Sequence, residues 1–173
     1  QVAVRLRLVP EAVRAEVLLD ERQVARRPVL SVVVPVYNGG ETIVENLALI
    51  RSAASRGLPP DDIELIVVSD GSVDGTTERL IEAQSDVDMH VIHYDRNFGK
   101  GYAVKMGALD AAGEWIAIVD ADLDLDPNSI PDYLETARRE RLDFAIGSKR
   151  HPDSVVYYPR SRRIASWCYQ QLN

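Results

Sequence analysis

Three short apolar runs, each followed closely by a cluster of polar residues, constrain the fold of this chain more than any other feature. The runs occupy residues 29–35, 63–68 and 116–119 and are rich in Val and Ile. Nearly uninterrupted apolar runs of this length are typical of strands that are buried on both faces of a parallel sheet. We therefore predict three buried strands whose carboxyl ends carry polar side chains.

Segments with helical spacing of apolar residues separate these strands, and two further short apolar runs complete the pattern. The predicted helices run from residue 43 to the break at 57–60, then over about 76–81, 103–112 and 130–140, and the additional strands lie at 89–92 and 143–147. Alternation of strands and helices at this spacing predicts an α/β fold with right-handed crossovers. We expect a Rossmann-like, doubly wound, mostly parallel sheet with helices on both faces.

The chain is long enough for one domain, since it has 173 residues of which 46% are hydrophobic. Apolar residues alternate over residues 2–8 and suggest a strand, but residues 1–28 carry no recognisable motif and are predicted to be an N-terminal extension or linker. The main domain is predicted to span 29–173. The sequence begins with Gln1 and stops at Asn173 inside an apparent helix, so we expect a piece of a longer protein that is incomplete at its C-terminal end.

Composition excludes several classes of protein. The formal net charge of -7 argues against general binding of nucleic acid. Cys168 is the single cysteine, which excludes an internal disulfide and a multi-cysteine zinc site. No apolar run approaches the roughly 20 residues of a membrane-spanning helix, and the start of the chain lacks the pattern of a signal peptide. We expect a soluble domain in a reducing compartment.

Four aspartates follow the strand at 116–119, namely Asp120, Asp122, Asp124 and Asp126. In an open α/β sheet, ligands bind outside the carboxyl ends of the strands, so this acidic cluster lies at the expected site. Carboxylates this close repel one another unless a cation joins them, and oxygen ligands favour Mg²⁺ or Mn²⁺. An acidic start of the following helix explains the same residues, and the four aspartates alone do not separate the two interpretations.

Four motifs, in this order, carry a resemblance to a known family. They are Val34–Asn38, Val67–Thr76, Asn97–Gly101 and Val119–Asp122. Together they resemble the family 2 glycosyltransferases of the GT-A fold, and are most similar to the polyprenyl-phosphate sugar synthases, the dolichyl-phosphate mannosyl- and glucosyltransferase group. The resemblance covers residues from about 29 to 163, most of the chain.

The resemblance implies a set of contacts with a nucleotide sugar. The implied contact residues are Pro35, Tyr37, Asn38, Glu41, Asp70, Gly99, Lys100, Asp120, Ala121 and Asp122. Tyr37 would stack on the base, and Asp70 would accept a hydrogen bond from the imide N–H of the base. Glycine and the helix-start N–H groups around Lys100 suit a phosphate, while a solvated lysine in a glycine turn is the alternative.

The sequence departs from the family pattern at two positions in these motifs. Gly39 stands where the family has an acidic residue after the Asn, and Glu41 is the expected substitute. Ser69 stands where the family commonly has the first of two adjacent aspartates, which leaves the preferred base open. Asp74 is more readily explained as a helix start than as a ligand.

The resemblance also assigns the acidic cluster. Asp120, Ala121 and Asp122 are similar to the metal-binding DxD motif, with Asp122 as the direct ligand and Asp120 on the metal or on sugar hydroxyls. Asp124 falls where lipid-phosphate members of the family often have a third, neutral metal ligand. Asp126, before a proline, is predicted to cap the next helix. A cation at this place would stabilise the charge that a nucleoside diphosphate gains as it leaves.

A basic cluster near the C-terminus completes the predicted site. The resemblance implies that Lys149, together with Arg162 or Arg163, holds the diphosphate or the phosphate of the acceptor. A solvated basic face is the alternative. The predicted catalytic residues are therefore Asp120, Asp122, Lys149, Arg162 and Arg163.

The resemblance implies an inverting transfer of a hexose from a UDP- or GDP-linked sugar to a polyprenyl phosphate. The full-length protein would act at the cytoplasmic face of a membrane, as a peripheral protein or through segments that this chain lacks. Two alternatives stay open: a family 2 enzyme that acts on a polysaccharide or soluble acceptor, and a nucleotide-sugar-binding module without turnover. A nucleotidyltransferase ranks lower, because the chain lacks a basic, glycine-rich loop after its first strand.

Overall fold

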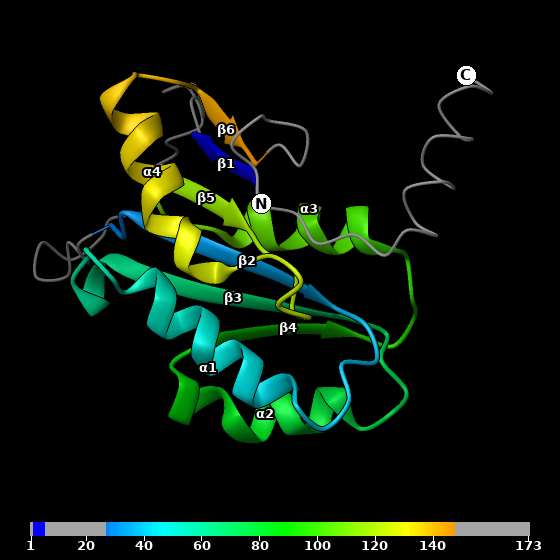
Figure 1. Ribbon diagram of the computed structural model, residues 1–173. Coiled ribbons are helices and arrows are strands. Elements are labelled where there is room, and N and C mark those ends of the chain that lie inside the picture. Colours follow the sequence, from blue (N-terminus) through cyan, green and yellow to red (C-terminus); the bar gives the residue numbers. More distant parts are fainter. Residues whose placement is uncertain (1, 6–26, 148–173) are drawn as a thin grey trace, which may run out of the picture.

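The computed structural model describes residues 2–5 and 27–147. Its strands are β1 (Val2–Arg5), β2 (Leu30–Val36), β3 (Ile63–Asp70), β4 (His90–Tyr94), β5 (Trp115–Ile118) and β6 (Phe144–Ile146). Its helices are α1 (Ile43–Ala54), α2 (Thr76–Val87), α3 (Lys100–Asp110) and α4 (Ile130–Arg139), with short 3-10 helices η2 (Pro60–Asp62) and η3 (Pro127–Ser129). Strands and helices alternate from β2 onward, as the sequence predicts (Figure 1).

In the described part of the chain, six strands form one sheet in the order β4-β3-β2-β5-β1-β6. β4, β3, β2 and β5 are parallel neighbours, whereas β1 pairs antiparallel with β5 and with β6. The prediction of a doubly wound, mostly parallel α/β sheet is confirmed. The alternation near the N-terminus does form a strand, and β1 lies inside the sheet between β5 and β6.

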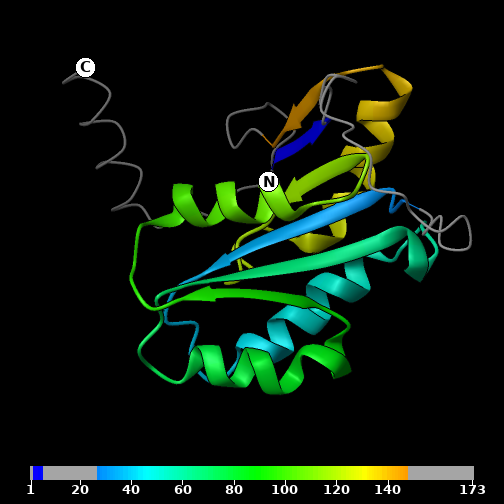
Figure 2. The ribbon, with the colours of Figure 1, turned by 180° about the vertical axis from the view of Figure 1, so that it is seen from behind.

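Helices cover both faces of this sheet. α1, α2 and α4 pack on one face, and α3 packs on the other, which Figure 2 shows from behind. Because side chains alternate along a strand, Val32 and Val34 of β2 belong to the core under α1, whereas Val33 belongs to the core under α3. The side chains of β3 alternate in the same way, with Val67 in the core under α1 and Ile66 in the core under α3. Burial on both faces is the reason why these strands are continuous apolar runs.

α2 is longer than the sequence suggests. The prediction ended the helix near Ile81, but it continues to Val87, which is buried and packs with the core. The intervening residues 82–86 are mostly polar and exposed. They show no helical spacing of apolar residues, although the backbone stays helical. Asp88, with a φ of 54°, ends the helix in the left-handed conformation. The predicted end was therefore wrong by about half a helix.

α3 lies very close to the sheet, and Gly107 makes this possible. A Cβ atom added at Gly107 would lie 2.5 Å from Cγ1 of Val33 and 3.1 Å from Cγ2 of Val68. Gly101, on the same helix, has no atom within 4 Å of such a Cβ. The two glycines thus occupy very different surroundings. Of these two positions, packing requires a glycine only at position 107.

We predict opposite effects of one substitution at these two positions. Gly107→Ala overpacks the face between α3 and β2 and should lower the free energy of unfolding by about 1–3 kcal/mol. Gly101→Ala should raise it by up to about 1 kcal/mol, because alanine favours the helix and meets no neighbour. Urea unfolding monitored by circular dichroism measures both. Equal effects of the two substitutions would contradict the close packing at Gly107.

Candidate functional site

Four loops meet at the carboxyl edge of the sheet. Because β2, β3, β4 and β5 are parallel, their last residues Val36, Asp70, Tyr94 and Ile118 lie at the same edge (Figure 1). The polar clusters that follow these strands in the sequence are therefore brought together, as predicted.

A cleft of about 510 Å³ opens at this edge between the β2–α1 loop, the start of α3 and the residues after β5. Its lining residues are Val36, Tyr37, Asn38, Gly39, Thr42, Ile43, Asn46, Lys100, Asp120, Ala121 and Asp122. Six of the residues predicted from the sequence are in this set: Tyr37, Asn38, Lys100, Asp120, Ala121 and Asp122. The other predicted residues within the described ranges do not line it, namely Pro35, Glu41, Asp70, Gly99 and Asp124.

Asn38 connects the β2–α1 loop to the β3–α2 loop. Its backbone N–H donates to Oγ of Ser72 at 3.1 Å, and its Oδ1 accepts from the N–H of Val73 at 3.0 Å. Asp74 makes a second connection, because one carboxylate oxygen accepts from Gly40 N at 3.1 Å and the other from Thr76 N at 3.1 Å. The helix α2 starts where predicted, with Gly75 as N-cap and Thr76 as first residue, and the Asp74 carboxylate binds Thr76 N from the position before the N-cap.

Hydrogen bonding from Thr76 holds the pKa of the Asp74 carboxyl below its usual value. The backbone N–H of Gly40 acts in the same direction, against the effect of partial burial. Asp74 therefore stays ionised at neutral pH and keeps the two loops connected. One wall of the cleft is fixed in this way.

Asp70 is a buried carboxylate at the end of β3, with an exposed fraction of 2%. Its Oδ1 accepts from Phe98 N at 2.9 Å and its Oδ2 from Gly99 N at 2.8 Å, so it fixes the β4–α3 loop. Burial, followed by the nearby Asp70 carboxylate, raises the pKa of the Tyr94 hydroxyl above its usual value. Both oxygens of Asp70 thus hold backbone. Its contact with a base stays a prediction.

The backbone approaches closely beside Asp70. Gly71 has a φ of 67°, and an added Cβ would lie 2.4 Å from the backbone N of Asn97. Glycine is required here by both conformation and space. Ser69, in place of the family's aspartate, is fully buried and lies 3.0 Å from Oγ of Ser72 and 2.8 Å from Oγ1 of Thr77. The Ser69 hydroxyl therefore completes a chain of hydroxyl groups within the β3–α2 turn.

The four aspartates of the acidic cluster differ in their positions and partners. Asp120 and Asp122 line the cleft, and Oδ1 of Asp120 lies 2.5 Å from Nζ of Lys100. Oδ1 of Asp122 accepts from Asp124 N at 3.1 Å. Asp126 is the N-cap of η3 and accepts from the following Asn128 N at 3.0 Å, which confirms its predicted capping role.

Sequence reasoning missed Asn46. Its side-chain amide donates to the carbonyl oxygen of Ala121 at 2.9 Å, and so holds the turn that carries Asp120 and Asp122. The sequence did contain a hint of this role, because Asn46 is a polar residue on the buried face of α1, next to Leu47 and one turn after Ile43. A buried polar side chain normally has a partner, but the sequence does not say which one.

A divalent cation is compatible with two of the predicted ligands. Among residues 2–5 and 27–147, no three His, Cys, Asp or Glu side chains lie together as a metal-binding group, so a site formed by Asp120, Asp122 and Asp124 stays a prediction. Mg²⁺ is usually bound by one or two carboxylates together with phosphate oxygens and water. Asp120 and Asp122 in the cleft fit that pattern. The predicted Lys149, Arg162 and Arg163 lie outside the described residues.

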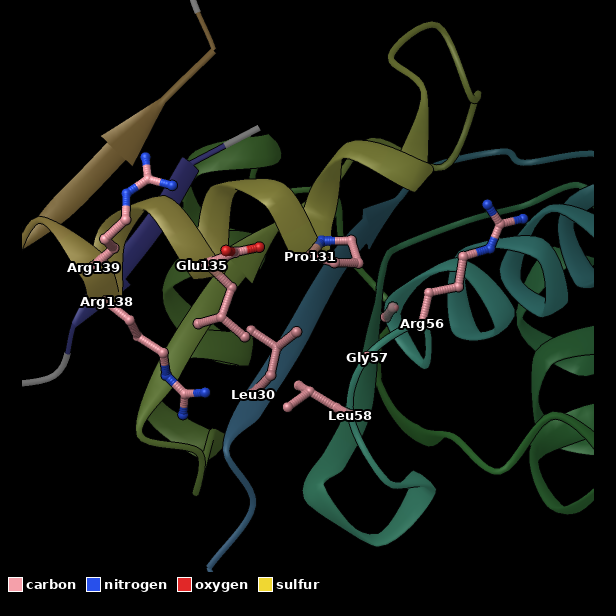
Figure 3. A pocket seen from close by; sticks show the side chains of 10 residues that line it. Leu30, Arg56, Gly57, Leu58, Pro131, Glu135, Arg138 and Arg139 are labelled. Carbon is pink, nitrogen blue, oxygen red and sulfur yellow. The ribbon is translucent and has the colours of Figure 1, made fainter.

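A second cavity, of about 390 Å³, lies at the opposite, amino end of β2. Figure 3 shows Arg56 on one side of it, Arg138 and Arg139 on the other, and Leu30 and Leu58 between them. Arg138 lies 3.8 Å from Glu114, and Arg139 lies 3.2 Å from Glu140. None of the predicted site residues lines this cavity, so the cleft at the carboxyl edge is the candidate functional site. In the described ranges, no helix is both long and apolar enough to cross a membrane.

Comparison with known proteins gives a consistent set of relatives. A family model described as Glycosyl transferase family 2 matches residues 31–172. The chain is 32% identical over 145 residues to dodecaprenyl-phosphate galacturonate synthase of Rhizobium johnstonii, which covers 83% of this chain and 41% of that protein. It is 39% identical over 140 residues to undecaprenyl-phosphate 4-deoxy-4-formamido-L-arabinose transferase of Yersinia pestis, which covers 78% of this chain and 41% of that protein. The chain thus spans less than half the length of these relatives.

Among solved structures, the chain resembles the crystal structure of S. aureus TarS 1-349 in complex with UDP-GlcNAc. The TM-score is 0.53 at 26% sequence identity, and the match covers 65% of this chain and 32% of that one. A protein that shares this fold has therefore been seen with a nucleotide sugar bound.

We predict that Asp70→Asn loosens the β4–α3 loop. The amide presents an NH₂ group to one of the two backbone N–H donors, so one partly buried donor loses its charged acceptor at a cost of about 1–3 kcal/mol. Hydrogen exchange should show lower protection of the Phe98 and Gly99 amides. Asp95→Asn, an exposed carboxylate in the same loop, is the matched control. Unchanged protection in Asp70→Asn would show that this carboxylate does not hold the loop.

Proposed function

This chain belongs to glycosyltransferase family 2, as its four motifs predict. We propose that residues 29–173, together with β1, form the nucleotide-sugar-binding domain of an inverting transferase. The donor is a UDP- or GDP-linked hexose, and the acceptor is a polyprenyl phosphate. The full-length protein works at the cytoplasmic face of a membrane, where such a lipid presents its phosphate.

The observation that carries this proposal is the composition of the cleft. It combines an aromatic ring, Tyr37, a cation, Lys100, and two carboxylates, Asp120 and Asp122, from three loops that are far apart in the sequence. A base can stack on the ring, a diphosphate can bind the ammonium group, and the carboxylates can hold a hard cation. The volume of about 510 Å³ lies within the range of roughly 300–1,000 Å³ for ligand pockets.

The residues then have distinct parts in the transfer. Tyr37, exposed at 52%, is accessible to a base. Asp122, with Asp120, supplies oxygen ligands beside the diphosphate, and the Asn46 side chain keeps their turn in place. A bound Mg²⁺ or Mn²⁺ would neutralise the charge that the nucleoside diphosphate gains as it departs. Lys149, Arg162 and Arg163 are proposed as further phosphate-binding residues.

The acceptor class is supported by the names of two relatives, which are a dodecaprenyl-phosphate galacturonate synthase and an undecaprenyl-phosphate 4-deoxy-4-formamido-L-arabinose transferase. A phosphate monoester has a second pKa of about 6 and is largely a dianion at neutral pH. Such a nucleophile needs to be positioned rather than deprotonated. The cleft accordingly supplies Lys100 and two carboxylates for orientation, with no histidine among its lining residues in the described ranges.

We expect metal-dependent binding of UDP or GDP to the full-length protein. Isothermal titration calorimetry should show tighter binding of one nucleotide in the presence of Mn²⁺, and Asp122→Asn should weaken it by at least about tenfold, which equals about 1.4 kcal/mol. Asp61→Asn makes the same charge change in η2 at the amino edge and should have no effect. Metal-independent binding that Asp122→Asn leaves unchanged would contradict the assignment of Asp122.

We expect transfer to lipid phosphate rather than to free sugars. Full-length protein with a radiolabelled UDP- or GDP-sugar should move label into the organic phase when polyprenyl phosphate is present, with inverted anomeric configuration in the product. Transfer only to a polysaccharide or soluble acceptor would favour the first alternative. Nucleotide-sugar binding without transfer to any acceptor would favour a binding module.

A further inference from the structure

An ion pair joins two residues that line the cleft, Lys100 and Asp120. Nζ of Lys100 lies 2.5 Å from Oδ1 of Asp120, and both residues line the cleft. The side chains are 62% and 39% exposed, respectively. An ion pair exposed to this degree contributes little to stability and is easily exchanged for another partner. The Lys100 ammonium group therefore binds the Asp120 carboxylate, which in the proposed function is a ligand of the divalent cation.

The backbone on both sides of this ion pair is held firmly. Gly99, directly before Lys100, donates to the buried Asp70 carboxylate at 2.8 Å, so the start of α3 is fixed to the end of β3. On the other side, Val119 N donates to the carbonyl oxygen of Val33 at 3.0 Å, and the carbonyl oxygen of Ala121 accepts from Asn46. The Lys100 and Asp120 side chains can thus change partners while their backbone stays in place.

We propose that Lys100 competes with the divalent cation for Asp120, and that it moves to the diphosphate when cation and nucleotide bind together. This rests on the proposed function. A cation that approaches Asp120 alone meets the ammonium group at ion-pair distance and is repelled by its charge. A nucleoside diphosphate offers Lys100 a new anionic partner, which frees Asp120 for the cation.

The exchange makes the binding of cation and nucleotide mutually dependent. By linkage, if nucleotide raises the affinity for the cation, the cation raises the affinity for nucleotide by the same factor. The unliganded protein therefore binds the free cation weakly, and the complete complex assembles around the diphosphate. Lys100 adds to the coupling that direct contact between the cation and the phosphate oxygens provides.

The test uses Lys100→Met in the full-length protein, which keeps most of the apolar stem and removes the charge. Binding of Mn²⁺ alone is measured by the electron paramagnetic resonance signal of the free ion, followed by titration with UDP and GDP. We expect Lys100→Met to bind Mn²⁺ alone about 3- to 10-fold more tightly than the unaltered protein. The factor by which nucleotide raises the Mn²⁺ affinity should become smaller than in the unaltered protein, and what is left of it reflects direct contact of the cation with phosphate oxygens. Lys100→Arg, which keeps a cation there, should bind Mn²⁺ alone as weakly as the unaltered protein.

Lys105→Met is the matched control, because Lys105 is exposed on the same helix and does not line the cleft. It should leave Mn²⁺ binding unchanged. The double variant Lys100→Met with Asp120→Asn should lose the gain, since the competition is for Asp120. A gain that survives in the double variant, or Mn²⁺ binding in Lys100→Met that is no tighter than in the unaltered protein, overturns the proposal.

These outcomes are separable from those of the proposed function. The Mn²⁺ measurement without nucleotide decides the competition between Lys100 and the cation, whatever the donor or acceptor is. Failure to bind any nucleotide, or to transfer sugar, counts against the proposed function. A gain in Mn²⁺ affinity that depends on Asp120 supports the competition even in that case.

Discussion

Parallel pairing of β2 with two neighbours is the constraint on which the rest of the structure depends. β2 pairs with β3 over seven residues and with β5 over four, and its side chains are buried on both faces. Parallel neighbours require crossover connections, which place helices on the two faces. The same pairing brings the carboxyl ends of the strands to one edge, and the cleft exists because residues after β2 and β5 meet there.

Much of this arrangement follows from the sequence, because burial on two faces leaves a distinctive apolar run. The strands and the layers were predictable in this way, whereas the cleft residues Tyr37, Lys100, Asp120 and Asp122 were assigned through the resemblance of four motifs to a known family. The end of α2 was not predictable, since polar exposed residues carry no apolar pattern. Contacts between distant segments were not predictable either. Asn46 looks like any polar helix residue until the fold places it beside Ala121.

Asp70 illustrates a different limit of sequence reasoning. A carboxylate at the end of a strand in a nucleotide-binding motif suggests a ligand contact, but the same side chain can also accept hydrogen bonds from partly buried backbone N–H groups. The structure shows the second use, with both oxygens bound to the β4–α3 loop. Residue type and position are the same for both roles. Only the distances to Phe98 and Gly99 show which partners the carboxylate has.

The close approach at Gly71 has a consequence for how this edge can change. The backbone beside Gly71 packs against the β4–α3 loop, and Asp74 ties the β3–α2 loop to the β2–α1 loop. Contacts therefore join three of the four loops to one another. The turn after β5 is joined instead to α1 by the Asn46 amide and to the start of α3 by an exposed ion pair. Exchange of a single loop between relatives would break contacts in the others. A change of the ligand that this edge binds would require the three loops to be exchanged together, or substitutions confined to exposed side chains such as Tyr37.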